Sequence, residues 1–211
     1  MTVSKEQMLD SLSLRCGKET AHKLVSARIA VCGLGGLGSN IATALCRAGV
    51  GNLHIIDFDK VDISNINRQQ YSISQIGMYK TDAMAMNLYE ISPFCHVRAD
   101  TVRLDEINIP KFLSDDDIII EALDDASAKA LLVNTILEKF PFKKLIAASG
   151  MAGLGSANDI ITRRVTSSLY ICGDAKNEVS PSSPLYASRV MLCAAHQAHM
   201  ALRIICGETQ P

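Results

Sequence analysis

A glycine-rich turn between two apolar runs constrains the fold of this chain more than any other feature of its sequence. Residues 29–32 (IAVC) are apolar and rich in branched side chains, which suits a strand buried on both faces of a sheet. The turn follows at 33–38 (GLGGLG), and apolar residues then recur at helical spacing over 39–48. A second apolar run, 53–56, ends in Asp57. This order predicts the first unit of a parallel α/β sheet.

The glycines have the spacing G-x-G-x-x-G. Gly33 allows the tight turn, Gly35 lets backbone N–H groups approach a phosphate, and Gly38 lets helix and strand pack closely. The amino end of the following helix adds a partial positive charge that favours an anion. Asp57 lies about 20 residues beyond the glycines, where a carboxylate can accept hydrogen bonds from ribose hydroxyls. The pattern predicts a nucleotide site and leaves the kind of nucleotide open.

Composition and charge exclude several classes of protein. The 211 residues carry a net charge of −1 with acids and bases interspersed, so no basic stripe indicates a nucleic-acid partner. No apolar run reaches the ~18 residues of a membrane span, and the amino terminus lacks the layout of a secretion signal, so we expect a cytoplasmic protein without a membrane partner. Seven cysteines without a C-x-x-C pair indicate a reducing compartment. We expect Cys32, Cys46, Cys193 and Cys206 in the core.

The remaining patterns predict an α/β fold, a Rossmann-like and mostly parallel sheet flanked by helices, with N-terminal helices and a C-terminal strand pair plus helix. We expect one domain over 1–211, with 27–150 as the nucleotide-binding core and 151–211 as sheet extension, crossover segment and final helix. The predicted elements are helices at 4–26, 80–90, 107–113, 127–140 and 186–206, strands at 96–100, 117–120 and 144–148, a strand pair at 159–165 and 168–172, and a crossover segment at 173–184.

Polar residues follow two of the predicted strands at their carboxyl ends, where open α/β sheets place their ligands. Arg68 and Lys80 lie beyond Asp57, and two cations suit a triphosphate better than the pyrophosphate of a dinucleotide. The same residues also fit an exposed loop of ordinary charges. Asp124 follows another strand, where a carboxylate either holds Mg²⁺ against phosphates or caps the next helix.

The combined pattern resembles a known family. The stretch RIAVCGLGGLGSN, the S-N-x-N-R-Q signature at 64–69, Lys80, and EALDD at 121–125 resemble the ThiF/MoeB family of bacterial relatives of ubiquitin-activating enzymes, in particular its short ThiF type, the sulfur carrier protein adenylyltransferases. The resemblance runs over almost the whole chain. The S-N-x-N-R-Q signature is much more specific than the glycines, and no dehydrogenase requires it.

The resemblance implies an enzyme that uses ATP and Mg²⁺ to adenylate the C-terminal glycine carboxylate of a ubiquitin-like sulfur carrier protein ending in Gly-Gly, releasing pyrophosphate, in thiamine biosynthesis. It also implies a homodimer in which Arg15 reaches the partner's site. The implied roles are a nucleotide loop of Gly33, Gly35, Gly36 and Gly38, ribose binding by Asp57 with Asp59 nearby, triphosphate binding by Asn65, Arg68, Gln69 and Lys80, and Mg²⁺ binding by Asp124.

The chain also departs from the family. Longer members carry two C-x-x-C pairs that bind zinc, and this sequence has none, so we expect no zinc. Some relatives form a thioester or persulfide through a cysteine in the crossover segment. Cys172 is the one cysteine placed for that role, and packing is the alternative for it.

Four other functions stay open at this stage. The first two are enzymes of the same superfamily, one that activates a molybdopterin carrier and one that acts as a tRNA-modifying dehydratase. The third is a nicotinamide-dependent oxidoreductase, which would leave Arg68, Lys80 and Asp124 unexplained. The fourth is a non-catalytic scaffold, which we would expect to have lost these charged residues.

Overall fold

The computed structural model describes residues 3–211 and contains one seven-stranded sheet. Its strands have the spatial order β3-β2-β1-β4-β5-β7-β6, and all neighbours are parallel except β6 and β7. The bounds are β1 (Arg28–Cys32), β2 (Asn52–Ile56), β3 (His96–Asp100), β4 (Ile118–Glu121), β5 (Lys144–Ala148), β6 (Ile161–Arg164) and β7 (Leu169–Gly173). The predicted Rossmann-like sheet and the C-terminal strand pair are confirmed.

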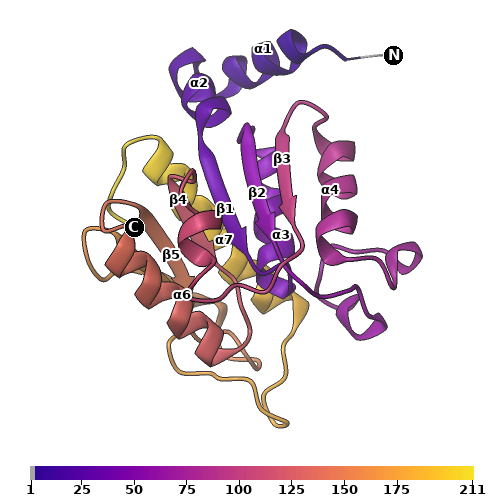
Figure 1. Ribbon diagram of the computed structural model, residues 1–211, viewed down its shortest axis with the longest axis vertical. Helices are drawn as coiled ribbons and strands as arrows, with labels where there is room; N and C mark the ends of the chain where they lie inside the picture. The colour runs from indigo at the N-terminus through magenta and orange to yellow at the C-terminus, as the bar shows by residue number, and fades with distance from the viewer. Residues whose placement is uncertain (1–2) are drawn as a thin grey trace.

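Helices cover both faces of the sheet (Figure 1). On one face lie α3 (Gly36–Arg47), α4 (Lys80–Ile91) and α7 (Ala187–Ile205), and on the other α5 (Ile109–Phe112) and α6 (Ala126–Lys139). Side chains of a strand alternate between faces, so Ile29 and Val31 pack toward α3 and α7, whereas Ala30 and Cys32 pack toward α5 and α6. Two hydrophobic cores result, one on each side of the sheet.

The first two helices lie at the end of the sheet where β1 and β2 begin (Figure 1). They are α1 (Lys5–Cys16) and α2 (Lys18–Ser26), and α1 buries none of its residues. Short 3₁₀ turns at 63–65, 73–75 and 157–159 complete the described elements. Within residues 3–211 no helix combines the length and the apolar character of a membrane span. Cys206 is exposed rather than in the core, because it follows the last turn of α7.

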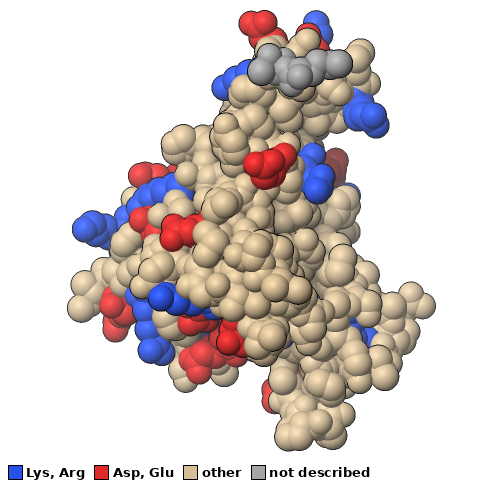
Figure 2. Space-filling view, turned by 90° about the vertical axis from the view of Figure 1, so that its right-hand side faces the viewer, with Lys and Arg blue, Asp and Glu red and all other residues tan. Residues whose placement is uncertain are grey.

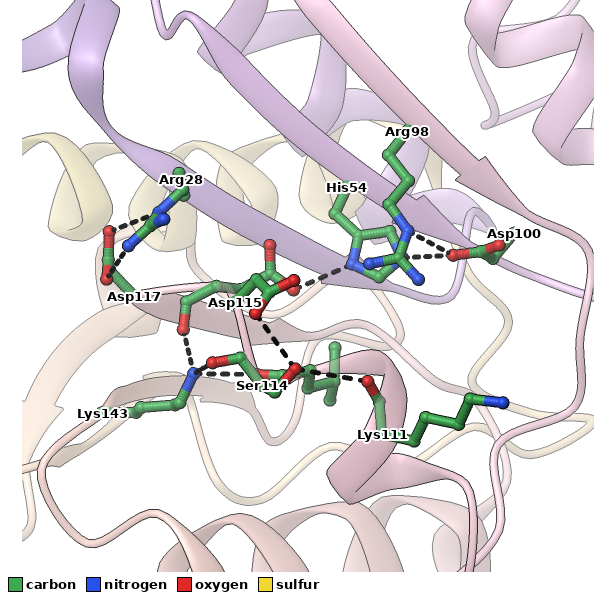
Figure 3. Close-up of polar contacts among 11 residues, drawn as sticks. Arg28, His54, Arg98, Asp100, Lys111, Ser114, Asp115, Asp117 and Lys143 are labelled. Atoms are coloured by element: carbon green, nitrogen blue, oxygen red, sulfur yellow. Dashed lines mark hydrogen bonds and ion pairs between the residues drawn. The ribbon is translucent and has the colours of Figure 1, made fainter.

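A polar network crosses the core face that α5 covers (Figure 3). His54 of β2 is 3% exposed, and its Nδ1 and Nε2 atoms lie 2.8 Å from carboxylate oxygens of Asp116 and Asp100. Arg98 pairs with Asp100 at 2.8 Å, and Lys143 donates to the carbonyl oxygen of Asp116. Both ring nitrogens of His54 thus have an acidic side chain as partner. The network joins β2, β3 and the turn before β4.

We expect His54→Leu to lower the free energy of unfolding by about 3 kcal/mol, because it leaves the Asp116 carboxylate buried without a partner. Urea denaturation monitored by circular dichroism measures the change. Arg28→Gln is the matched control, since it breaks an ion pair with Asp117 whose side chains are 55% and 60% exposed. The control should cost less than about 1 kcal/mol. Equal losses in the two variants would contradict a structural role for His54.

Candidate functional site

The glycine turn lies between β1 and α3, at the point where the strand order reverses from β1 to β4. Gly33 has a φ of +93°, and a Cβ atom there would lie 2.6 Å from the carbonyl oxygen of Ala122. A Cβ atom on Gly38 would lie 1.8 Å from the carbonyl oxygen of Gly33. Packing alone therefore requires these two glycines. A Cβ atom on Gly35 would meet only the Gln69 side chain, at 3.9 Å, so the backbone there is open to a ligand.

Asp57 connects the end of β2 to this turn. Its Oδ2 atom accepts a hydrogen bond of 2.6 Å from the Leu34 N–H, and its Oδ1 atom accepts one of 2.8 Å from the Asp59 N–H. Tyr71 donates from its hydroxyl to the Leu34 carbonyl at 2.9 Å, which fixes the same residue from the other side. Burial raises the pKa of Asp57, and the charge of Lys80 opposes that shift.

Lys80 brings a positive charge to these two acids. Its Nζ atom lies 2.8 Å from Asp59 Oδ2 and 3.8 Å from Asp57 Oδ2, and the residue is only 6% exposed. Lys80 is also the first residue of α4, where the helix dipole disfavours a cation. The two carboxylates offset that cost. The structure thus brings Asp57, Asp59 and Lys80 together beside the glycine turn.

Arg68 and Gln69 reach the same place from the loop after β2. The Nη1 atom of Arg68 donates to the Ser64 carbonyl and to Asn67 Oδ1, both at 2.9 Å. The Arg68 stem lies 3.6 Å from where a Cβ atom of Gly36 would be. Arg68 Nε and Gln69 Oε1 are buried, and neither has a hydrogen-bond partner in the part of the chain that the structure describes. Such atoms are costly unless a ligand satisfies them.

The first turn of α3 holds this loop against the glycines, through residues that the sequence did not single out. Asn40 donates from Nδ2 to the carbonyl oxygens of Gly36, at 2.7 Å, and Arg68, at 3.2 Å. Gln70 donates from Nε2 to Asn40 Oδ1 at 2.7 Å, and its N–H donates to Ser39 Oγ at 3.1 Å. A Ser-Asn pair inside a helix, where both residues are unfavourable, was the available signal.

Asn65 and Asp124 have different surroundings. Asn65 accepts from the Asp62 N–H at 3.0 Å and so closes a turn, and its contact with phosphate stays a prediction. Asp124 is exposed, and Asp125 rather than Asp124 caps α6 by accepting from the Ala128 N–H at 2.8 Å. The capping alternative for Asp124 was wrong. Among residues 3–211 no three His, Cys, Asp or Glu side chains gather as a metal site, so Asp124 would share Mg²⁺ with ligand phosphates.

Arg15 lies far from the glycine turn of its own chain. It is exposed in the last turn of α1 and lines a cavity with Gly49 and Gly51, which precede β2. The glycine turn follows the carboxyl end of β1, at the opposite end of the same sheet (Figure 1). Arg15 therefore cannot act on the site of its own chain. Its action on a partner's site stays a prediction.

Cys172 lies within β7 and is fully buried. Its Sγ atom is 3.4 Å from Thr162 Oγ1, which is in turn 3.0 Å from Nδ1 of His196. Burial raises the pKa of the Cys172 thiol to about 11, against a smaller lowering by the hydrogen bond with Thr162. The surroundings of Cys172 favour the packing alternative, and the covalent role stays a prediction.

A buried ion pair fixes the start of the crossover segment beside the glycine turn. Arg189, in the first turn of α7, pairs with Asp174 and donates from Nη1 to the Ser156 carbonyl at 2.7 Å. Burial acts to raise the pKa of Asp174, but hydrogen bonds from Asn177, Lys176 and Arg189 outweigh it and hold the pKa at about 2. The next residue, Val190, lies 2.9 Å from where a Cβ atom of Gly36 would be. The sequence pattern did not identify Arg189 as part of the site.

We expect Lys80→Met to lower the free energy of unfolding by about 2 kcal/mol near pH 7, because ionised Asp57 then stays buried without its cation. The loss should shrink as the pH falls through the pKa of Asp57, since the protonated carboxyl group needs no cation. Urea denaturation near pH 7 and at about pH 4 measures both values. The control is Lys60→Met, which removes an exposed lysine above the Tyr79 ring. A loss independent of pH would contradict this account.

Comparisons with known proteins agree with this architecture. The ThiF family model matches residues 9–211. The chain is 37% identical over 128 residues to the tRNA threonylcarbamoyladenosine dehydratase of Bacillus subtilis (strain 168), a match that covers 60% of the chain and 50% of that protein. It is 33% identical over 136 residues to the probable molybdopterin-synthase adenylyltransferase of Porphyra purpurea, a match that covers 64% of the chain and 35% of that protein. The chain thus spans half or less of the length of these relatives.

Solved structures show the same fold. The crystal structure of E. coli tRNA N6-threonylcarbamoyladenosine dehydratase, TcdA, in complex with ATP matches with a TM-score of 0.86 at 20% identity, over 98% of each chain. At this identity the likeness concerns the fold. The family match covers nearly the whole chain and includes every residue of the glycine turn, the Asp57 cluster and the Arg68 loop. This chain belongs to the ThiF family.

Proposed function

We propose that this chain is an ATP-dependent enzyme that adenylates a carboxylate. The observation that carries the proposal is the pair of buried and unpartnered polar atoms, Arg68 Nε and Gln69 Oε1, beside the open backbone of Gly35. A nucleotide phosphate at the glycine turn supplies an acceptor for the arginine. The family membership and the ATP complex of the E. coli dehydratase support ATP as the nucleotide.

The residues of the site suit this reaction. The buried carboxylate of Asp57 can accept hydrogen bonds from ribose hydroxyls. Arg68 and Lys80 offset negative charge while a substrate carboxylate attacks the α-phosphorus of ATP and pyrophosphate leaves. Asp124 would hold Mg²⁺, which would neutralise phosphate charge. No side-chain base is needed, because the attacking carboxylate is already ionised near neutral pH. The enzyme acts by positioning and charge stabilisation.

Two classes of carboxylate are candidates for the substrate. The 37% identity with the Bacillus subtilis dehydratase favours a threonylcarbamoyladenosine of tRNA, whose threonyl group carries a carboxylate, over the thiamine carrier expected from the sequence. The second candidate is the C-terminal glycine of a ubiquitin-like carrier. It rests on the adenylyltransferase relatives, including the MOCS3 of Drosophila virilis, and on the net charge of −1, which disfavours RNA.

We expect ATP–pyrophosphate exchange to require Mg²⁺ and one of these carboxylates. The exchange is measured with tRNA that carries threonylcarbamoyladenosine, with carriers ending in Gly-Gly, and with the same carriers lacking the last glycine. Arg68→Ala and Asp124→Ala should each reduce the rate by roughly 10²–10⁴, the range for loss of a charge-stabilising group. Lys111→Ala, which removes an exposed lysine of α5, is the control and should not change it. Exchange that needs no carboxylate, or full rates in both site variants, would overturn the proposal.

We also propose that the active form is a homodimer in which Arg15 serves the partner's site. Arg15 lies at the far end of the sheet from its own glycine turn, so only another chain can bring the two together. Figure 2 shows a side of the molecule with few charged groups over much of its area. The side chains of Ile73, Ile76, Tyr79, Met86 and Tyr89, in α4 and the segment before it, are apolar and exposed. Such a surface suits contact with a second copy.

We expect a mixture of Arg15→Ala and Lys80→Ala chains to recover about a quarter of wild-type exchange activity, although each variant alone is inactive. Half of the dimers in an equal mixture are mixed, and one of their two sites keeps both wild-type residues. A mixture of Arg68→Ala and Lys80→Ala is the control. Those two residues lie in one site of one chain, so no mixed dimer has an intact site. Absence of recovery in confirmed mixed dimers would remove Arg15 from the partner's site.

A further inference from the structure

The cavity that Arg15, Gly49 and Gly51 line lies at the end of the molecule opposite the glycine turn. It has a volume of about 280 Å³ and lies between α1 and the segments that lead into β2 and β3. Leu9, Leu12 and Phe94 give it an apolar wall, and Lys5, Arg15 and Arg47 add positive charge. The space is large enough for several water-sized molecules. The adenylation chemistry proposed above does not use this cavity within the same chain.

Two thiols share the wall of this cavity. Cys46 belongs to the last turn of α3, and Cys95 is the residue directly before β3. Both side chains line this cavity, and each thiol acts on the pKa of the other, so the two are neighbours on its wall. Cys46 also donates to the Leu88 carbonyl at 3.6 Å. Each cysteine of residues 3–211 is a free thiol, and these are the two that line this cavity together.

The two thiols differ in how readily they ionise. The hydrogen bond from Cys95 lowers the pKa of Cys46, burial opposes that shift, and the charge of Arg47 adds to it. The same hydrogen bond, together with burial, raises the pKa of Cys95. Since the thiolate is the reactive form, Cys46 is the better nucleophile, and Cys95 is placed as the thiol that reacts second.

We propose that Cys46 and Cys95 form an oxidisable dithiol site, in which a peroxide that enters the cavity converts the two thiols into a disulfide. The Cys46 thiolate attacks one oxygen of hydrogen peroxide, the O–O bond breaks, and the leaving hydroxide takes up the proton released by Cys46 to give water. The sulfenic acid formed on Cys46 is then attacked by the Cys95 sulfur, and a second water leaves with the Cys95 proton. The two sulfurs lose two electrons in total, and the peroxide gains them.

A second pair of cysteines in the chain serves as an internal control. The Cys193 thiol donates to the Cys172 carbonyl at 3.7 Å, so these residues are also neighbours. Both are fully buried, and burial raises their pKa values to about 11 and about 12. Cys46 is itself only 3% exposed, so the second pair differs in that neither thiol lines the cavity and both have raised pKa values. This pair should therefore stay reduced. Cys206 is exposed and reports that the oxidant is active.

The test treats the folded, full-length chain with hydrogen peroxide, alkylates the remaining thiols and maps disulfides by non-reducing proteolysis and mass spectrometry. We expect a peptide pair joined through Cys46 and Cys95, lighter by two hydrogens and released by dithiothreitol, while Cys172 and Cys193 are alkylated. Cys95→Ser should stop the reaction at a sulfenic acid on Cys46, which dimedone traps. Cys46→Ser should prevent the crosslink and leave Cys95 free.

Two results would overturn the proposed dithiol site. One is a wild-type chain in which Cys206 is oxidised and Cys46 and Cys95 remain reduced. The other is a disulfide map in which disulfides from Cys46 or Cys95 to other cysteines are as frequent as the Cys46–Cys95 disulfide. Circular dichroism checks that the variants fold. If a serine variant does not fold, the corresponding alanine variant, Cys46→Ala or Cys95→Ala, replaces it. The disulfide map of the wild-type chain tests the proposal even without a variant. Cys172→Ser is the matched substitution and should leave the Cys46–Cys95 crosslink unchanged.

Discussion

The hydrogen bond from the Leu34 N–H to Asp57 connects the two halves of the candidate site. It joins the turn after β1 to the end of β2, and Lys80 extends the connection to the first residue of α4. A buried carboxylate at this position needs both the N–H donors and the cation, because burial acts against its charge. The geometry of the glycine turn, the loop after β2 and α4 therefore depends on one ionised side chain.

The rest of the site is a set of backbone segments held by side-chain amides. Asn40 and Gln70 fix the Arg68 loop to the first turn of α3, and Arg189 fixes the carbonyl of Ser156 to the start of α7. The side-chain amides of Asn40 and Gln70 are hydrogen-bonded within the protein, whereas Arg68 Nε and Gln69 Oε1, and also Arg189 Nε, have no partner among the described residues. A site whose backbone segments are already held in place, and whose buried polar groups still lack partners, is preorganised for a polar ligand, which lowers the ordering cost of binding.

The order of strands and helices was predictable, because the central strands are largely apolar runs and the turns between elements carry glycine or polar residues. The residues that follow strand ends were also predictable, since the carboxyl ends of parallel strands meet at one edge. Partners that come from distant segments were not. His54 looks like a polar residue in an apolar strand until Asp100 and Asp116 face it. In the sequence, Asp124 and Asp125 are equally suited to cap the following helix. Only the backbone geometry shows that Asp125 caps α6.

The sheet ends in two strands that protect it from other sheets. β6 is the outermost strand beside β7, so its outer edge has no paired strand, and it carries the side chains of Arg163 and Arg164. At the opposite edge β3 carries Arg98, which is ion-paired to Asp100. Charged side chains on short edge strands oppose pairing with a strand of another molecule. The seven-stranded sheet that positions the candidate site thereby disfavours edge-to-edge pairing with the sheet of another molecule.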